Sequence, residues 1–274
     1  MKRFFRNFAF TSGFVLTVAL IVVAVAAPLL APFDPNQQDT ARRLEAPSHG
    51  HLLGLDDLGR DVLSRIIWGA RVSLRVGFSV VLLASIIGVT LGAMAGYFGG
   101  WMDTIIMRIT DILLSFPGIL LAIAMVAVLG PSLNNVVIAL ATQGWVGYAR
   151  LARGQVLKVR EMEYVIAAKA LGARSPRVIA LHVLPNVINP LIVMATLGLA
   201  GAILAEAALS FLGLGVQPPT PSWGAMLTSG RRYLGLANHL AIWPGVAIMI
   251  AVMGLNFLGD GLIDALDPKY RKDL

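Results

Sequence analysis

Long apolar stretches without charged residues alternate with short polar segments along most of the chain. The uncharged runs lie at residues 7–33, 76–102, 112–149, 178–205, 207–230 and 233–259. A helix that crosses a bilayer needs about 20 consecutive apolar residues, so each run is long enough to supply a span. The pattern therefore predicts a polytopic membrane protein built from helices.

Six spans follow from these runs. The run at 112–149 is long enough for two spans, because Gly130, Pro131 and Ser132 supply a turn within it. Glu206 interrupts a single long hydrophobic segment, which we count as one span. We therefore predict an all-α fold with six transmembrane helices, at about 10–32, 73–98, 108–130, 133–150, 187–212 and 239–263.

Positive charge sets the predicted orientation. Cations flank the first and last spans, at Lys2, Arg3, Arg6, Lys269, Arg271 and Lys272. With both termini cytoplasmic, 14 of the 22 Lys and Arg residues lie inside, as the positive-inside rule favours. A cleaved signal peptide is the alternative for the first span. The apolar region of this span is too long for a signal peptide, however, and Pro28 directly follows the small residues Ala26 and Ala27.

Composition agrees with a lipid environment. Hydrophobic residues make up 57% of the chain and charged residues 14%, against about 25% charged residues in soluble domains. The net charge of +7 sits mainly in short loops beside the apolar runs, so we expect membrane lipid as a partner and no nucleic acid. The absence of Cys excludes disulfides, a thiolate metal site and a Cys nucleophile.

The segment at 164–185 differs from the spans around it. It lies in the largest predicted cytoplasmic loop, about 150–186, and its alanines favour a helix. Ser175 is suited to cap a second helix that has Pro176 at its first position. Small residues would let another backbone approach closely, which favours a docking surface. The alternative is a solvated connector whose cations only enforce the topology.

The same segment resembles the cytoplasmic signature of permease subunits of ATP-binding-cassette importers. That signature is Glu-Ala-Ala, three residues, Gly, nine residues and Ile-x-Leu-Pro; Ala167, Ala168, Gly172, Leu184 and Pro185 match it. Ile166 replaces the Glu, and His182 replaces the Ile. In the family this loop forms a coupling helix that sits in a cleft of the ATPase subunit. The resemblance thus implies an ATPase-coupling role for Ala167, Ala168, Gly172, Ala173, His182, Leu184 and Pro185.

Three longer motifs, at 51–74, 209–227 and 256–268, resemble the dipeptide, oligopeptide and nickel branch of these permeases. The likeness is greatest to the second permease of the pair. It implies the type I permease architecture, in the bacterial cytoplasmic (inner) membrane. The implied partners are a homologous permease, two cytoplasmic ATPase subunits and an extracytoplasmic solute-binding protein.

The implied function is to form half of a translocation pathway for di- or oligopeptides and to couple ATPase motion to alternating access. Nickel and glutathione are the alternative solutes, because solute choice in such systems resides largely in the binding protein. ATP and Mg belong to the partner ATPases, and no cofactor is expected in this subunit. A stand-alone channel or an intramembrane enzyme is the alternative from another class.

Two segments are predicted to lie on the outer side. Residues 58–70 form an amphipathic helix in the interface plane, with Arg60 and Asp61 on its polar face. Prolines keep residues 217–223 out of regular helix, so this stretch is a stiff loop that ends at an interfacial Trp. Contact with the binding protein and plain structural support are both open for them. The candidates for this contact are Arg60, Asp61, Pro218, Pro219 and Trp223.

Glu206 is the one carboxylate deep in a predicted span, and an ionisable residue there is a candidate for function. It could line the pathway, pair with a neighbouring subunit, or stay protonated near the outer interface. No GxSxG, HExxH or Walker phosphate motif occurs, so we expect no catalytic residue, no metal site and no ATP hydrolysis in this chain. We divide the chain into an N-terminal segment, 1–72, and a core permease domain, 73–274.

Overall fold

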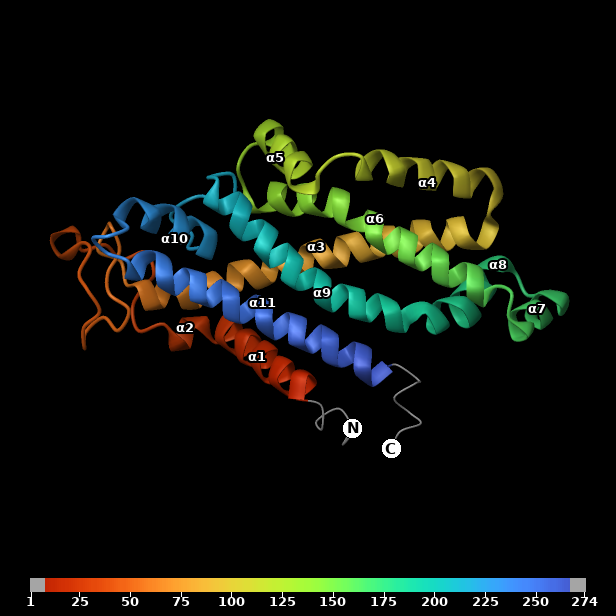
Figure 1. Ribbon diagram of the computed structural model, residues 1–274, viewed down its shortest axis with the longest axis horizontal. Coiled ribbons are helices and arrows are strands. Elements are labelled where there is room, and N and C mark those ends of the chain that lie inside the picture. The colour runs from red at the N-terminus through yellow and green to blue at the C-terminus, as the bar shows by residue number, and fades with distance from the viewer. Residues whose placement is uncertain (1–7, 267–274) are drawn as a thin grey trace.

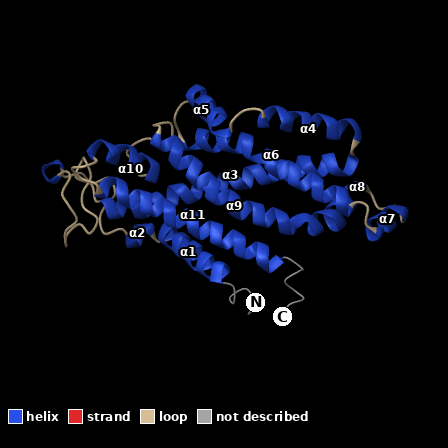
Figure 2. Cartoon of the chain, viewed as in Figure 1, coloured by secondary structure: helices blue, strands red, loops and turns tan. Residues whose placement is uncertain are grey.

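A computed structural model describes residues 8–266 as an elongated bundle of helices (Figure 1). Figure 2 shows helices and loops and no strand in that part of the chain. The helices are α1 (Phe8–Val25), α2 (Ala27–Leu30), α3 (Val62–Phe98), α4 (Gly100–Leu114), α5 (Gly118–Leu129), α6 (Leu133–Val159), α7 (Glu163–Ala170), α8 (Ser175–Val178), α9 (Leu184–Phe211), α10 (Trp223–Gly230) and α11 (His239–Leu266). Short turns of other helical types are η2 (Thr40–Arg42), η3 (Ile179–Val183) and η4 (Arg231–Tyr233). The predicted all-α class is confirmed.

The number of spans differs from the six predicted. Four helical units within residues 8–266 are long and apolar enough to cross a membrane: α1, α3, α11 and the continuous unit Ser175–Phe211. The bent pair α4 and α5 would add a fifth. The predicted span at 133–150 lies in α6, whose 27 residues measure about 40 Å. Polar residues lower the hydropathy of α6, and its packing against α3 and α9 covers much of it with protein.

The segment predicted as a span at 108–130 is sharply bent. The chain forms α4 and α5, whose axes meet at 87° across a short break. Pro117 has an extended backbone conformation and precedes the first residue of α5. A residue before proline is disfavoured in the helical region, so the helix ends before Phe116.

The amphipathic stretch predicted to be helical at 58–70 is helical only from Val62, and it belongs to the same helix as the span that follows. The Asp61 carboxylate accepts a hydrogen bond from the Ser64 N–H and caps α3, which then continues without a break to Phe98. No proline lies between the amphipathic part and the apolar part, so nothing ends the helix there. The predicted domain boundary after residue 72 consequently falls inside α3.

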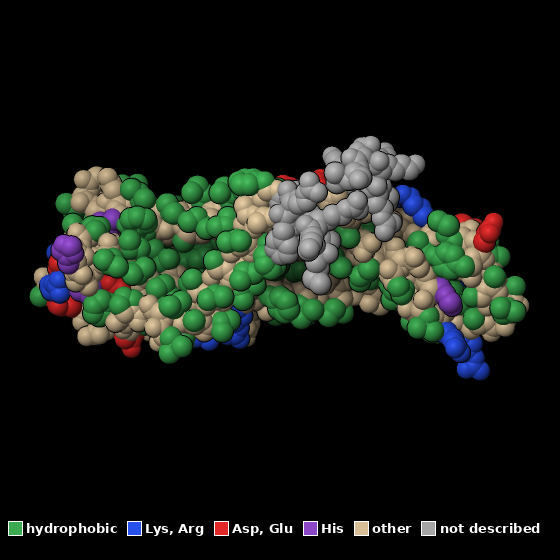
Figure 3. Space-filling model, turned by 90° about the horizontal axis from the view of Figure 1, so that it is seen from below, with side chains coloured by type: hydrophobic (Ala, Val, Ile, Leu, Met, Phe, Trp, Pro, Cys, Tyr) green, Lys and Arg blue, Asp and Glu red, His purple; other side chains and the backbone are tan. Residues whose placement is uncertain are grey.

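Two helix pairs organise the bundle. The most extensive packing joins α3 to α6, and the next joins α1 to α11 (Figure 1). The loop at 31–61 and α10 lie at one end of the bundle, whereas α7 and α8 lie at the other. On the face shown in Figure 3, apolar side chains predominate along the middle and charged side chains gather mainly toward the two ends. The flanking cations predicted to fix the termini lie outside the described residues.

Candidate functional site

The coupling segment, which we define as residues 163–185, stands at one end of the bundle (Figure 1). It consists of α7, a turn, α8 and η3, and it continues directly into α9. The predicted helix–turn–helix is therefore confirmed. The predicted cap is not, because α8 begins at Ser175 with Arg174 as its N-cap residue and no side-chain capping bond.

Buried valines fasten the coupling segment to the bundle. Val165, Val178 and Val183 are fully buried in a cluster that includes side chains of α3, α6 and α9. The ammonium of Lys169 lies 4.7 Å from the centre of the Tyr97 ring, a cation–π contact to the end of α3. The segment is thus tied to α3, α6 and α9, so a force on it reaches these helices directly.

The opposite face of the coupling segment leaves apolar side chains uncovered in this chain. Leu171 is 89% exposed at the turn after α7, and Ile166 and Leu181 are 52% and 59% exposed. Of the residues to which the resemblance assigns a coupling role, Ala167, Gly172 and Pro185 are exposed, whereas Ala168, Ala173, His182 and Leu184 are half-buried. The small and the large apolar side chains together form a surface suited to an apolar groove.

Gly172 has a different reason to be glycine from the one the sequence suggested. Its φ of +83° lies in the left-handed region, and apart from its chain neighbours no atom of the described residues lies within 4 Å of where its Cβ would be. It follows the C-cap residue of α7, and the Ala173 N–H donates to the Ala168 carbonyl across it. The backbone turn itself therefore requires glycine here.

A cavity of about 940 Å³ runs along the middle of the bundle. Its walls come mainly from α3, α6 and α9, with two residues from the end of α11. Apolar side chains form most of the lining, and Gln143, Tyr148 and Asn189 supply its polar groups. None of the described residues that line it is charged, so they offer hydrogen bonds to a solute but no fixed charge.

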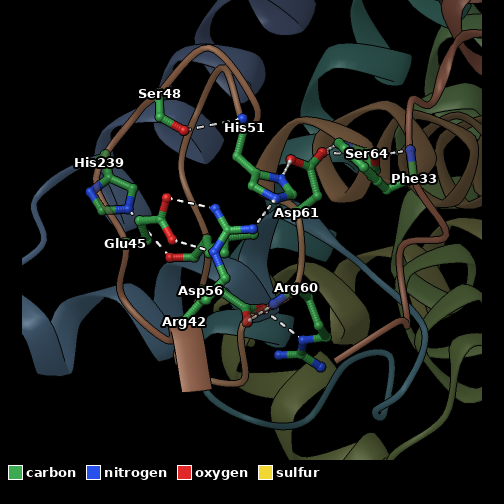
Figure 4. Close-up of polar contacts among 11 residues, drawn as sticks. Phe33, Arg42, Glu45, Ser48, His51, Asp56, Arg60, Asp61, Ser64 and His239 are labelled. Carbon is green, nitrogen blue, oxygen red and sulfur yellow. Dashed lines mark hydrogen bonds and ion pairs between the residues drawn. The ribbon is translucent and has the colours of Figure 1, made fainter. Parts of the chain in front are cut away.

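A network of polar side chains organises the loop at the other end (Figure 4). His51 Nδ1 lies 2.9 Å from Asp61 Oδ1, and His51 Nε2 lies 3.4 Å from Arg42 Nη1. A guanidinium only donates, so His51 Nε2 accepts in this contact and Nδ1 donates to Asp61. Arg42 also makes two 2.7 Å bonds to Glu45, which lower the pKa of this carboxyl below its ordinary value.

A second part of this network buries Arg60. Its Nε lies 2.7 Å from Asp56 Oδ2, and Arg65 Nε lies 3.5 Å from the same oxygen. Arg60 and Asp61 are 7% and 3% exposed, so neither lies on the surface that the sequence predicted for them. Burial of a charge requires a partner, and these two residues hold the loop together by pairing within it.

The proline-rich loop, which we define as residues 213–222, lies at the same end of the bundle. Pro218 and Pro219 are exposed, as expected for a contact surface. Trp223, at the start of α10, is only 2% exposed, and its Nε1–H donates to the Ile66 carbonyl at 3.0 Å. Trp223 is thus not at the membrane interface as predicted; it is buried and joins α10 to α3 through this hydrogen bond.

Glu206 is fully buried and does not border the cavity. The Ser210 hydroxyl donates to its Oε1 at 2.7 Å, and the Ser73 hydroxyl lies 3.5 Å from its Oε2. The buried Ser222 side chain also interacts with this carboxylate. Glu206 forms no ion pair within residues 8–266.

Sequence reasoning missed Leu171 and the polar lining of the cavity. The exposure of Leu171 depends on the turn after α7, although an apolar residue before glycine in a polar loop was a usable signal. Gln143, Tyr148 and Asn189 belong to α6 and α9 and meet only after these helices pack. No periodicity within one helix identifies such a meeting.

Two known families match the sequence. Residues 88–272 match the family described as binding-protein-dependent transport system inner membrane component. Residues 1–47 match the N-terminal transmembrane domain of oligopeptide transport permease C.

Relatives match along nearly the whole chain. The dipeptide transport system permease protein DppC of Alkalihalophilus pseudofirmus is 48% identical over 270 residues, which cover 98% of this chain and 89% of the relative. The glutathione transport system permease protein GsiD of Pectobacterium atrosepticum is 45% identical over 271 residues, which cover 98% and 90%. A DppC of Haemophilus influenzae is 44% identical over 265 residues, which cover 94% and 89%.

The fold has a solved counterpart. An inward-facing structure of the MetNI methionine ABC transporter aligns with a TM-score of 0.60 and 20% identity, over 75% of this chain and 97% of that chain. At this identity the likeness concerns the fold alone. The fold and the matches in sequence agree, and the chain belongs to the family of inner-membrane permease components of binding-protein-dependent transport systems, the permeases of ABC importers.

Proposed function

We propose that this chain forms half of an ATP-driven import channel for dipeptides or oligopeptides. The observation that carries the proposal is the order of parts along the bundle. An exposed apolar surface lies at one end, the proline-rich loop lies at the other, and an uncharged cavity lies between them. Two relatives named as dipeptide permeases support the peptide as the solute.

The coupling segment is the proposed site of ATPase docking. Ala167, Gly172 and Leu171 would enter the cleft of an ATPase subunit, because they are exposed and because two of them match the signature. Ala168, Ala173, His182, Leu184 and Pro185 would shape the same contact. ATP and Mg would bind in the partner, and closure of two ATPases would pull on α3, α6 and α9 through the buried valines.

The cavity is the proposed half of the translocation pathway, completed by the homologous second permease. Peptides carry both charges and varied side chains, so a pathway with few fixed polar groups would bind them weakly and release them. An extracytoplasmic binding protein would then select the solute. Its proposed contact is the exposed Pro218 and Pro219. Arg60, Asp61 and Trp223 are buried and would stabilise this end of the bundle through their internal bonds.

Glutathione is the second candidate solute, because a glutathione permease is 45% identical to this chain. Deletion of the gene for this chain in its host should abolish uptake of a radiolabelled dipeptide supplied at low concentration. Expression of the chain from a plasmid should restore that uptake. Uptake of glutathione and nickel, measured in the same cells, separates the solutes. Dipeptide uptake that survives the deletion, with glutathione uptake lost, would assign the chain to glutathione.

The proposed orientation places the coupling segment in the cytoplasm and the proline-rich loop outside. Single cysteines at Arg177 and Thr220, both exposed, can report it in a chain that has no Cys of its own. We expect an impermeant maleimide to label Thr220→Cys in intact spheroplasts and Arg177→Cys only after permeabilisation. The reverse pattern would invert the proposed topology.

A further inference from the structure

We propose that Glu206 is a positioning residue that anchors the proline-rich loop to the transmembrane helices. The loop then moves with α3 and α9 as one body. This inference rests on the proposed function, in which the loop meets the binding protein. It assigns to Glu206 a role different from lining the pathway.

Three elements meet at the Glu206 carboxylate. Ser210 belongs to the last turn of α9, Ser73 to α3, and Ser222 is the N-cap residue of α10. The Ser210 and Ser73 hydroxyls lie 2.7 Å and 3.5 Å from the carboxylate oxygens, and the Ser222 side chain interacts with the same group. Glu206 has no exposed surface. A buried carboxylate is stable only when it is hydrogen-bonded, so the three elements are held at fixed positions around it.

Ser222 is the connection between this cluster and the loop. It is the final residue of the proline-rich loop, and its Oγ also accepts from the Ala225 N–H at 3.2 Å. The same side chain therefore caps α10 and interacts with the Glu206 carboxylate. The neighbouring stretch 217–220 is exposed, so Ser222 fixes the point at which the exposed loop returns to the bundle.

Close packing around the cluster leaves this end of the loop little freedom. A Cβ on Gly224 would lie 2.3 Å from the Ala207 carbonyl oxygen, so α10 sits directly on α9. The Thr228 hydroxyl donates to the Phe211 carbonyl at 2.7 Å, and Trp223 bonds the Ile66 carbonyl. Packing sets the distance between α9 and α10, and the carboxylate determines where the loop joins them.

Two substitutions separate hydrogen bonding from volume and charge. Glu206→Gln keeps the size and one acceptor oxygen but loses the charge, whereas Glu206→Leu keeps much of the volume and loses both acceptors. A nitroxide at Thr220→Cys reports loop mobility in the assembled transporter in nanodiscs, and one at His49→Cys, in another exposed loop, is the control. Hydrolysis of ATP is measured with and without loaded binding protein.

We expect Glu206→Leu to mobilise the label at Thr220 but not at His49. We also expect it to lower the stimulation of ATP hydrolysis by loaded binding protein about tenfold or more, which corresponds to the loss of one hydrogen bond to a charged group. Basal hydrolysis should stay near that of the wild type. Glu206→Gln should leave both readouts close to the wild type. If the label at Thr220 stays immobile in Glu206→Leu, the proposal is wrong. It is also wrong if Glu206→Gln abolishes uptake while the label at Thr220 stays immobile.

A rescue pair keeps the test decisive if Glu206→Leu fails to fold. Ser222→Asp retains a good N-cap residue but places a second carboxylate beside Glu206, and the repulsion should mobilise the label. Adding Glu206→Gln should immobilise it again, because the amide donates to the new carboxylate. If the label at Thr220 stays mobile in the double variant, Glu206 does not anchor the loop. A label that mobilises without any change in stimulated hydrolysis supports the anchor and contradicts the loop's proposed contact with the binding protein.

Discussion

Replacement of Gly92 by leucine should prevent the packing of α3 against α6 and abolish assembly of the permease. Gly88, Gly92 and Gly96 follow one another at four-residue spacing on the face of α3 that meets α6. A Cβ on Gly92 would lie 2.2 Å from the Ala149 carbonyl oxygen, and one on Gly88 would lie 2.3 Å from that of Trp145. The obstacles are backbone atoms, so a rotamer change cannot relieve them.

The cost of this substitution is large for a membrane protein. Overpacking of a core typically costs about 1–3 kcal/mol when side chains can shift, and we expect at least the upper end of this range here. Helices in membranes associate largely through such close contacts between small residues. The α3–α6 pair is the most extensive in the bundle, so its separation should disrupt the cavity as well.

Thermal unfolding in detergent, followed by size-exclusion chromatography, measures the effect of Gly92→Leu. The control is Gly154→Ala on α6, since outside its own helical turn no atom of the described residues lies within 4 Å of where the new Cβ would be. We expect Gly154→Ala to elute as the wild type does and Gly92→Leu to aggregate or disappear. A stable, monodisperse Gly92→Leu would mean that α3 and α6 lie farther apart than described.

Replacement of Ala167 by arginine should uncouple the transporter without unfolding it. Ala167 is exposed in the middle of α7, so arginine there strains no backbone and displaces nothing in this chain. Gly172→Arg is a poorer test, because its φ of +83° makes any side chain unfavourable even before a partner binds. In the proposed complex the long cation would occupy the ATPase cleft, where overpacking again costs about 1–3 kcal/mol.

Co-purification of the ATPase subunits and uptake in proteoliposomes measure this effect. We expect Ala167→Arg to lower ATPase recruitment about tenfold or more and to abolish uptake. Ala46→Arg, the same change at an exposed alanine in the loop at the other end of the bundle, should leave recruitment unchanged. Normal recruitment and uptake by Ala167→Arg would falsify the coupling role and leave the segment as a solvated connector.

The apolar runs predicted the later spans well because their ends carry clear local signals. The predicted span at 239–263 matches α11, and the one at 187–212 lies within three residues of α9 at either end. The errors fall where local signals compete. Pro117 lies inside an apolar run and divides the predicted span into α4 and α5. No helix-breaking residue follows Ala70, so the amphipathic stretch and the next span form one helix, α3.

The candidate sites were predictable to different degrees. The coupling segment could be located because its small residues, its Gly172 turn and its prolines are contiguous in the chain. Arg60, Asp61 and Trp223 were recognised as notable but not as buried, since their partners come from other segments. Burial of a polar side chain depends on what the rest of the chain brings to it.

The sequence by itself determined that the chain is helical, inserts in a membrane, carries a compact basic segment and belongs to a permease family. These properties depend on solvation of apolar runs and on local motifs, which act within tens of residues of each other. Only the tertiary structure decided that Glu206 faces three serines and not the cavity, and that glycines hold α3 against α6. Both depend on the rotation and approach of whole helices, which follow from packing across the bundle.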